Sequence, residues 1–279
     1  MYVGDSSNSP VEQMSVKKYS QTSNPNLLDN TNFFNPINQR NQTSYSNTEA
    51  APKYSIDRWQ VLGGTFDVQT RTYTSNSTLG IYGNQFRQYI PLENVSIGDT
   101  ITVSSVINDT RHVFTTTIPQ YGDSVTGAPF LLETTWGGFK MITREAEHAA
   151  LLTMVVNVSQ SITVDWIKME LGNFATPYVS KEYSVELSEC LRYFQAIFMD
   201  WRTYPPLNGL IYRIPMTTLQ VMRVKPTITK STEPYTFGCD ITGMDAQSTG
   251  FAVQVTVNQT GFTAGAVALL GYFNLSSEF

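Results

Sequence analysis

The sequence predicts a mainly β protein, with a jelly-roll β-sandwich followed by a linking helix and a second small β-sandwich. Short runs of β-forming residues recur along most of the chain, and Gly, Asn and Asp pairs separate them. No long amphipathic helix lies between these runs. Regular short strands with turn signals are typical of sandwiches, whereas alternating strands and helices would indicate a parallel α/β sheet.

Residues 1–25 form a polar segment that contains glycine and prolines and shows little periodicity. Such a segment cannot bury enough apolar surface to fold alone. It is either a flexible leader or a docking peptide that attaches the protein to a larger assembly. The apolar anchors of the docking interpretation are Tyr2, Val3, Val11, Met14, Val16 and Tyr19.

Residues 26–180 supply the strands of the predicted jelly roll. The strands are predicted at 54–61, 66–73, 79–82, 86–90, 100–107, 113–118, 130–136 and 151–158, with a last one from Ser161. In this last strand Ile162 and Val164 alternate with residues that are also bulky, which is typical of a central strand covered on both faces.

Residues 181–200 are predicted to form a helix that links the two sandwiches. Leu187, Leu191, Phe194 and Phe198 recur at three- and four-residue spacing, which places them on one helix face. Ser184 is the expected N-cap. We expect this apolar stripe to pack between the domains or around a threefold axis.

Residues 201–279 are predicted to form the second, smaller β domain. The run from Phe251 to Val257 alternates apolar and polar residues, as in a half-buried strand. A domain of roughly 80 residues buries limited surface, which favours packing against a partner. We therefore expect this domain to pack against a partner.

The composition excludes several classes of function. With 18 Lys+Arg against 23 Asp+Glu, the chain has no basic excess to neutralise phosphates, so a nucleic-acid partner is not expected. No apolar run approaches the roughly 20 residues of a membrane helix, and no secretory signal is visible at the N-terminus. Cys190 and Cys239 lack companions for a metal or redox motif and are expected to be buried thiols. No cofactor and no metal are predicted, although Asp29, Asn30 or Asp57 could contribute oxygens to a structural calcium.

Sugar binding requires aromatic faces together with polar hydrogen-bonding partners. Trp136 precedes Gly137-Gly138, where a loop-edge indole can be exposed, but a core position remains the alternative. Trp59 and Trp166 lie inside strand patterns and are expected in the core. The candidate sugar-binding residues are Trp136, Tyr121, Asp123, Arg111 and Tyr73, with His112 beside them.

Catalytic residues are not predicted. The two histidines lie far apart in the sequence and neither belongs to a metal-binding motif. A pair of carboxylates could in principle act as glycosidase acids. The carboxylates considered for such a pair are Glu133, Glu145, Glu147, Asp165 and Glu170.

Several segments, in a fixed order, resemble tail-fibre and other structural proteins of bacteriophages and prophages. They read NLLDNTNFFNPINQR from residue 26, YSIDRW from 54, VDWIKMELGNFATPYVSKEYSVELSECLRYFQ from 164, and RIPMTTLQVMRVKPTIT from 213. The resemblance implies a jelly roll similar to carbohydrate-binding modules and a C-terminal β domain of a kind that often supports trimers. It also implies a virion protein that is made in the cytoplasm of the host bacterium.

The expected function is therefore that of a non-enzymatic virion fibre or appendage. Its N-terminal segment would attach to portal, tail or capsid proteins, and the jelly roll would recognise a glycan of the host surface. The alternatives are a purely structural head fibre or capsid decoration protein and, as a third reading, a glycan-degrading tail fibre. Neither nucleic-acid binding nor membrane insertion is expected.

Overall fold

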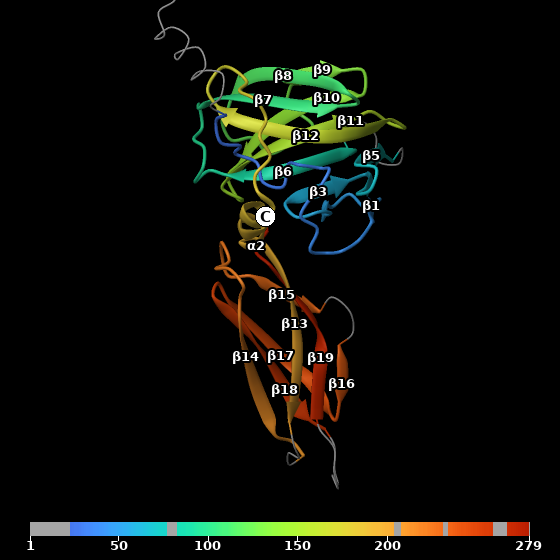
Figure 1. Ribbon diagram of the computed structural model, residues 1–279, viewed down its shortest axis with the longest axis vertical. Coiled ribbons are helices and arrows are strands. Elements are labelled where there is room, and N and C mark those ends of the chain that lie inside the picture. The colour runs from blue at the N-terminus through green and yellow to red at the C-terminus, as the bar shows by residue number, and fades with distance from the viewer. Residues whose placement is uncertain (1–22, 77–82, 204–207, 231–233, 259–266, 279) are drawn as a thin grey trace, which may run out of the picture.

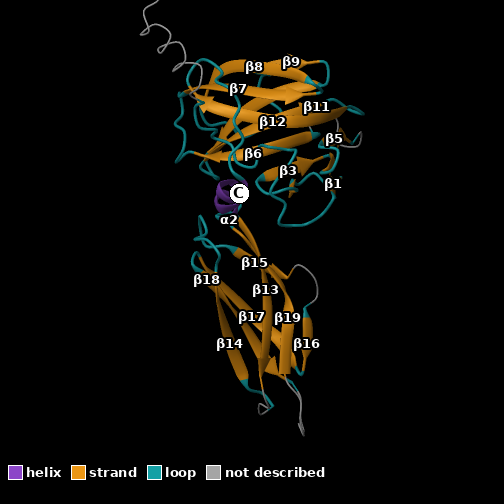
Figure 2. Cartoon of the chain, in the orientation of Figure 1, coloured by secondary structure: helices purple, strands orange, loops and turns teal. Residues whose placement is uncertain are grey.

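The computed structural model describes residues 23–76, 83–203, 208–230, 234–258 and 267–278. Two β bodies lie end to end, with the helix α2 at the waist between them (Figures 1 and 2). The predicted mainly β class is confirmed. Within the described part of the chain, no helix is long and apolar enough to cross a membrane. The six N-terminal anchor residues predicted for attachment, Tyr2 to Tyr19, lie outside the described residues.

The first body consists of two six-stranded sheets whose strands pair antiparallel throughout. The first sheet has the order β1 (Ser44–Asn47), β4 (Gly64–Asp67), β5 (Thr72–Ser75), β12 (Ser161–Leu171), β7 (Thr100–Ile107) and β8 (Thr110–Thr117). The second has the order β2 (Lys53–Tyr54), β3 (Trp59–Leu62), β6 (Gln85–Pro91), β11 (Ala149–Val156), β10 (Gly137–Arg144) and β9 (Leu132–Thr134). The chain crosses repeatedly between the sheets, as in a jelly roll.

An aromatic cluster fills the space between these sheets. The Phe86 ring stacks on Trp59 at 4.8 Å and on Phe66 at 4.7 Å, and Phe33 packs across the Trp59 ring. All four side chains are buried. Trp59 occupies the core position that its strand pattern predicts, and its indole N–H donates to the carbonyl of Asn30.

The predicted strand at 54–61 is wrong in one respect, because a turn divides it. Strand β2 ends at Tyr54, and the backbone N–H of Ser55 donates to the carbonyl of Trp59. Arg58 has φ of 72°, an uncommon conformation for a residue with a side chain. The turn carries Asp57 and Arg58 away from the strand pattern and toward the second body.

The linking helix α2 spans Tyr183–Leu191, so the predicted helix at 181–200 is too long. Phe194 and Phe198 belong to strand β13 (Phe194–Thr203), where successive residues face opposite sides of the sheet. The apolar spacing suits both a helix and a strand over so short a run, and pairing with β19 decides in favour of the strand. Ser184 is not the N-cap; Glu182 holds that position without a side-chain capping bond.

The second body is the small β-sandwich predicted for the C-terminal region. One sheet contains β13, β19 (Val267–Ser276), β15 (Thr227–Lys230) and β16 (Tyr235–Phe237), and the other contains β14 (Ile211–Thr217), β18 (Gly250–Val257) and β17 (Cys239–Gln247). Phe251, Val253, Val255 and Val257 are buried between the sheets, as their alternation predicts. The thiols of both cysteines are buried and unpaired in disulfides, and burial raises the pKa of each.

Candidate functional site

Trp136 and Tyr73 are not available to a ligand, which corrects two of the sugar-binding predictions. Trp136 is 5% exposed and packs edge-on against Phe139 in the core, while Tyr73 is fully buried. The glycines that follow Trp136 begin strand β10 instead of forming a loop. A Cβ at Gly137 would lie 2.0 Å from a carbonyl oxygen of β11, so the glycine permits close packing of strands and not exposure of the indole.

The other three sugar-binding candidates are exposed but do not form one site. Arg111 lies on strand β8 of the first sheet. There it lines an open groove of about 450 Å³ with Trp166 and Tyr178, whose rings stack at 4.6 Å. Tyr121 and Asp123 belong to the loop over the second sheet. The predicted cluster is therefore divided between opposite faces of the jelly roll.

The outer face of the second sheet carries a polar groove of about 220 Å³. Its sides are the chain around Ala50 and residues 123–126. Its floor is formed by residues of strands β3, β6, β10 and β11 that alternate along each strand with the core-facing residues. These floor residues are Leu62, Gln85, Arg87, Ile142, Arg144 and Leu151. These described lining residues are aliphatic and polar, so the groove offers hydrogen bonds, charge and C–H contacts rather than aromatic stacking. We call it the sheet groove.

Arg87 is the most unusual residue of the sheet groove. Its side chain is held by two amide oxygens, with Nε donating to Gln60 Oε1 at 2.9 Å and Nη1 donating to Gln85 Oε1 at 3.0 Å. Only 7% of the residue is exposed, and burial lowers the pKa of its guanidinium. No described carboxylate lies within ion-pair distance of it, although buried charges in proteins are normally paired.

The second arginine of the groove, Arg144, is already partnered. Its Nη1 lies 3.2 Å from a carboxylate oxygen of Glu147 and donates to the hydroxyl of Tyr89 at 2.8 Å. Asp123 contributes a carboxylate to the lining of the groove. The groove thus presents one unneutralised cation, one neutralised cation and one exposed acceptor.

A buried lysine fixes the loop that forms one side of the sheet groove. Lys140 Nζ donates to the carbonyls of Ala128 and Val125 and lies 4.6 Å from the centre of the Phe130 ring. Val125 is buried against the sheet in a small apolar cluster. Because the loop is tied at several points, the shape of the groove is set before any ligand binds.

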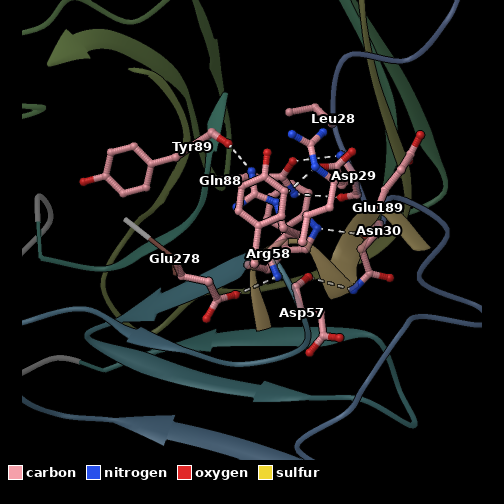
Figure 3. Close-up of polar contacts among 12 residues, drawn as sticks. Leu28, Asp29, Asn30, Asp57, Arg58, Gln88, Tyr89, Glu189 and Glu278 are labelled. Atoms are coloured by element: carbon pink, nitrogen blue, oxygen red, sulfur yellow. Dashed lines mark hydrogen bonds and ion pairs between the residues drawn. The ribbon is translucent and has the colours of Figure 1, made fainter. Parts of the chain in front are cut away.

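Residues of the jelly roll, of the helix α2 and of the end of the chain near Glu278 meet at the waist of the molecule, which we call the joint (Figure 3). Arg58, which is 1% exposed, makes an ion pair with Asp29 at 3.1 Å and donates to the carbonyl of Tyr89 at 2.8 Å. Its guanidinium lies 3.5 Å from the centre of the Tyr193 ring, on the chain that enters the second body. The backbone N–H of Asn30 donates to Glu186 of α2, so the helix is bound to the jelly roll as well.

A second arginine closes the joint on its other side. Arg40 pairs with Asp57 at 3.1 Å and with Glu278 near the C-terminus, and it stacks on the Phe194 ring at 3.8 Å. Burial raises the pKa of Asp57 to about 7, against the lowering effect of Arg40. The contacts of Arg58 with Tyr193 and of Arg40 with Phe194, together with the ion pair between Arg40 and Glu278, therefore connect the two bodies.

The predicted interface residues have different environments. Phe194 is buried beneath Arg40 at the joint, and Leu187 and Leu191 are partly buried on α2. Phe198, in contrast, is 49% exposed on the outer face of the second body. The four side chains do not share one stripe.

A buried ion pair fixes the chain as it leaves the jelly roll. Lys168 and Glu170 form a fully buried ion pair at 3.2 Å on β12. Lys168 Nζ also donates to Thr176 Oγ1 at 2.6 Å and to the carbonyl of Pro177 at 3.1 Å. The Thr-Pro segment predicted as a break is thus bound back onto the sheet face.

The three residues considered for a structural calcium do not converge on one site. Of the three residues considered for calcium, Asp57 faces Arg40, and Asn30 uses its side chain on the backbone of Ile37 and Asp57. Asp29 lies close to Glu186 and Glu189, but Lys181 sits among them at 3.5 Å from Asp29 and 2.6 Å from Glu189. An ammonium group is therefore already paired with two of these three carboxylates.

Three of the carboxylates considered for glycosidase chemistry are held by cations. Glu170 pairs with Lys168, Asp165 with Arg71, and Glu147 with Arg144. Sequence reasoning found Asp123 of the sheet groove but missed Arg87 and Gln85. Their strand is buried along its whole length, and only the pairing of β6 with β3 and β11 shows that they face the groove.

Comparison with known proteins identifies no relatives: no family model, curated protein or solved structure matches the chain.

Proposed function

We propose that this chain is a non-enzymatic appendage of a bacteriophage particle, in which the jelly roll recognises a glycan of the host surface. The proposal depends on the ordered segments that resemble phage structural proteins. In the fold these segments build the joint and the exit of the jelly roll, so their resemblance concerns the architecture that connects the two bodies. The ligand-binding role is assigned to the sheet groove.

The geometry of the sheet groove suits a saccharide. It is an open depression with a partly aliphatic floor, two arginines, an amide and a carboxylate. Such groups can bond to hydroxyl oxygens while aliphatic carbons contact the C–H faces of a sugar ring. One copy of the protein would bind the glycan weakly, and display of several copies on one particle would raise the overall affinity.

Adsorption of phage to host cells tests this role. Purified full-length protein should compete with phage for the cell surface, and removal of surface polysaccharide should abolish its binding to cells. If the protein neither binds cells nor competes, the sandwich is a spacer, and a structural head fibre or decoration protein becomes the better assignment. Shortening of a bound polysaccharide during incubation would instead indicate a glycan-degrading fibre.

The attachment role belongs to residues 1–25 in this proposal. Deleting them should abolish incorporation of the protein into particles while the thermal unfolding of the remaining chain is unchanged. Incorporation of the shortened chain at the normal level would contradict this assignment. Immunolabelling of particles in the electron microscope would show whether the protein is on the head or the tail.

An apolar sheet face of the second body supports the proposed homotrimer. Phe198 and Tyr272 are 49% and 51% exposed and lie against one another at 5.0 Å. Tyr235 and Phe237 continue this face on β16, beside Leu270. Contiguous exposed apolar surface of this kind marks protein interfaces in soluble proteins.

Sedimentation velocity tests the oligomer. The protein should sediment as a trimer at micromolar concentration, and Phe198→Asp should shift it toward monomer without unfolding it. Val113→Asp, at an exposed apolar position of the jelly roll, is the matched control and should remain trimeric. A monomeric parent protein would refute the proposal.

A further inference from the structure

We propose that the sheet groove selects an anionic saccharide, one that carries a carboxylate or a phosphate group, and that Arg87 binds this group. The inference rests on the proposed glycan recognition and specifies its ligand. It follows from a mismatch in the groove, where a buried cation has no ion-pair partner among the described residues.

The guanidinium of Arg87 is largely removed from water, and no carboxylate of the described residues lies within ion-pair distance of it. Its two hydrogen bonds go to neutral amide oxygens, through Nε and Nη1, and the rest of its donor fork has no acceptor among the described residues. A guanidinium offers five N–H donors, and its outer edge matches the two oxygens of a carboxylate or a phosphate. Arg87 therefore retains both the charge and the donors for an anionic group.

The amides of Gln60 and Gln85 orient this donor fork. Gln60 lies opposite Arg87 on the neighbouring strand, and Gln85 precedes it by two residues on the same face of β6. Both amides hold the guanidinium in place. An amide carries no charge, so neither neutralises the guanidinium, whereas an acidic residue in either place would. The side chain is thus positioned before binding, which reduces the entropy lost when a ligand is bound.

The remaining charged groups of the sheet groove favour an acidic sugar over a plain anion. Arg144 is neutralised by Glu147 and therefore does not attract a second anion strongly. Asp123, at the side of the groove, would repel an anion placed next to it but can accept hydrogen bonds from sugar hydroxyls. The ligand that fits both ends has an acidic group over Arg87 and hydroxyl groups toward Asp123, which a plain anion such as inorganic phosphate does not provide.

Binding of defined oligosaccharides to the full chain tests the proposal. The probes are an oligogalacturonate, its neutral methyl ester with the same ring skeleton, a phosphorylated oligosaccharide and inorganic phosphate, each titrated calorimetrically. We expect an acidic oligosaccharide to bind at least about tenfold more tightly than the neutral ester, because hydrogen bonds to charged groups contribute more than neutral ones. The carboxylate and phosphate probes decide which acidic group the groove takes.

Two variants at Arg87 separate recognition from folding. Arg87→Gln should remove the preference for the acidic probe, and Arg87→Lys, which keeps the charge but not the fork, should retain part of it. The control is Arg202→Gln, whose guanidinium is exposed on the second body and should leave binding unchanged. Thermal unfolding of each variant shows whether the fold is retained.

Each outcome decides the proposal. Acid-selective binding that depends on Arg87 supports it. Equal binding of the acid and its ester, or binding that Arg87→Gln leaves intact, overturns acid selectivity while glycan recognition stands. Failure of every saccharide to bind, together with normal binding of the protein to host cells, overturns the saccharide ligand itself and leaves a surface protein as the receptor.

Discussion

Replacing Arg58 by methionine should destabilise the protein by about 3 kcal/mol. The buried guanidinium forms an ion pair with Asp29, bonds to the carbonyl of Tyr89 and stacks on Tyr193. Removing one member of a buried ion pair costs about 3–5 kcal/mol, because the other charge remains without its partner. Asp29 retains Lys181 at 3.5 Å, so we take the lower end of that range.

The loss should be visible in both equilibrium and thermal unfolding. For a cooperative unit of 150–250 residues, about 3 kcal/mol corresponds to a fall in Tm of about 6–12 °C. Urea titrations followed by tryptophan fluorescence give the free energy of unfolding directly. Limited proteolysis between the helix α2 and strand β13 should also accelerate, because Arg58 holds Tyr193 in place.

The matched control is Arg202→Met, which removes a guanidinium that is exposed and paired with Asp200 on the same strand. Its effect should be below about 0.5 kcal/mol, since exposed ion pairs contribute little. If Arg58→Met lowers the free energy of unfolding by less than about 1 kcal/mol, or by no more than the control does, Arg58 does not hold the joint.

Three further predictions concern other buried groups. Lys168→Met should lower the free energy of unfolding by about 3–5 kcal/mol in denaturant titrations, because Glu170 would remain buried without a cation; a loss below about 1 kcal/mol would contradict this. Asp57 has a pKa raised from 3.8 to about 7, so its stabilising contribution is complete below about pH 4 and is lost as the pH rises through 7. The stability of the parent relative to Asp57→Asn should therefore fall between about pH 4 and pH 7, and a constant difference would refute the assignment. Gly137→Ala should cost at least about 2 kcal/mol in thermal unfolding, since its Cβ would meet the carbonyl oxygen of Val155 at 2.0 Å and its φ is +138°; an unchanged Tm would show that the strands can separate there.

The sequence predicts the two sandwiches well because alternation and turn residues depend on local chemistry. Trp59 and Val253 occupy the buried positions that their strand patterns indicate. The turn at residues 55–58 was missed because Ile56 and Arg58 keep the alternation while tertiary contacts bend the chain. Phe194 was assigned to a helix for a similar reason: its spacing fits both structures, and only its pairing with Ser276 from the far end of the chain selects the strand.

The sheet groove was largely inaccessible to sequence reasoning. Aromatic residues beside glycines suggested an exposed platform, but Trp136 fills the core, since its glycines permit close strand packing. Arg87 gave no signal because an arginine within a short strand pattern is ordinary on an outer sheet face. Its significance arises from register and burial, which bring it beside Gln60 and away from any described carboxylate.

The joint has a mechanical consequence. Strands β13 and β19 are paired along ten residue pairs, from Phe194 with Ser276 to Thr203 with Val267, and both are tied to the jelly roll at the same end. Phe194 is bound through Gln39 and Arg40, and Glu278 follows β19 into contact with Arg40. A force applied to the far end of the second body would thus be shared by two strands that are both anchored to the jelly roll. The protein should transmit tension and torque between its two bodies as a stiff rod, and a single peptide linker would not.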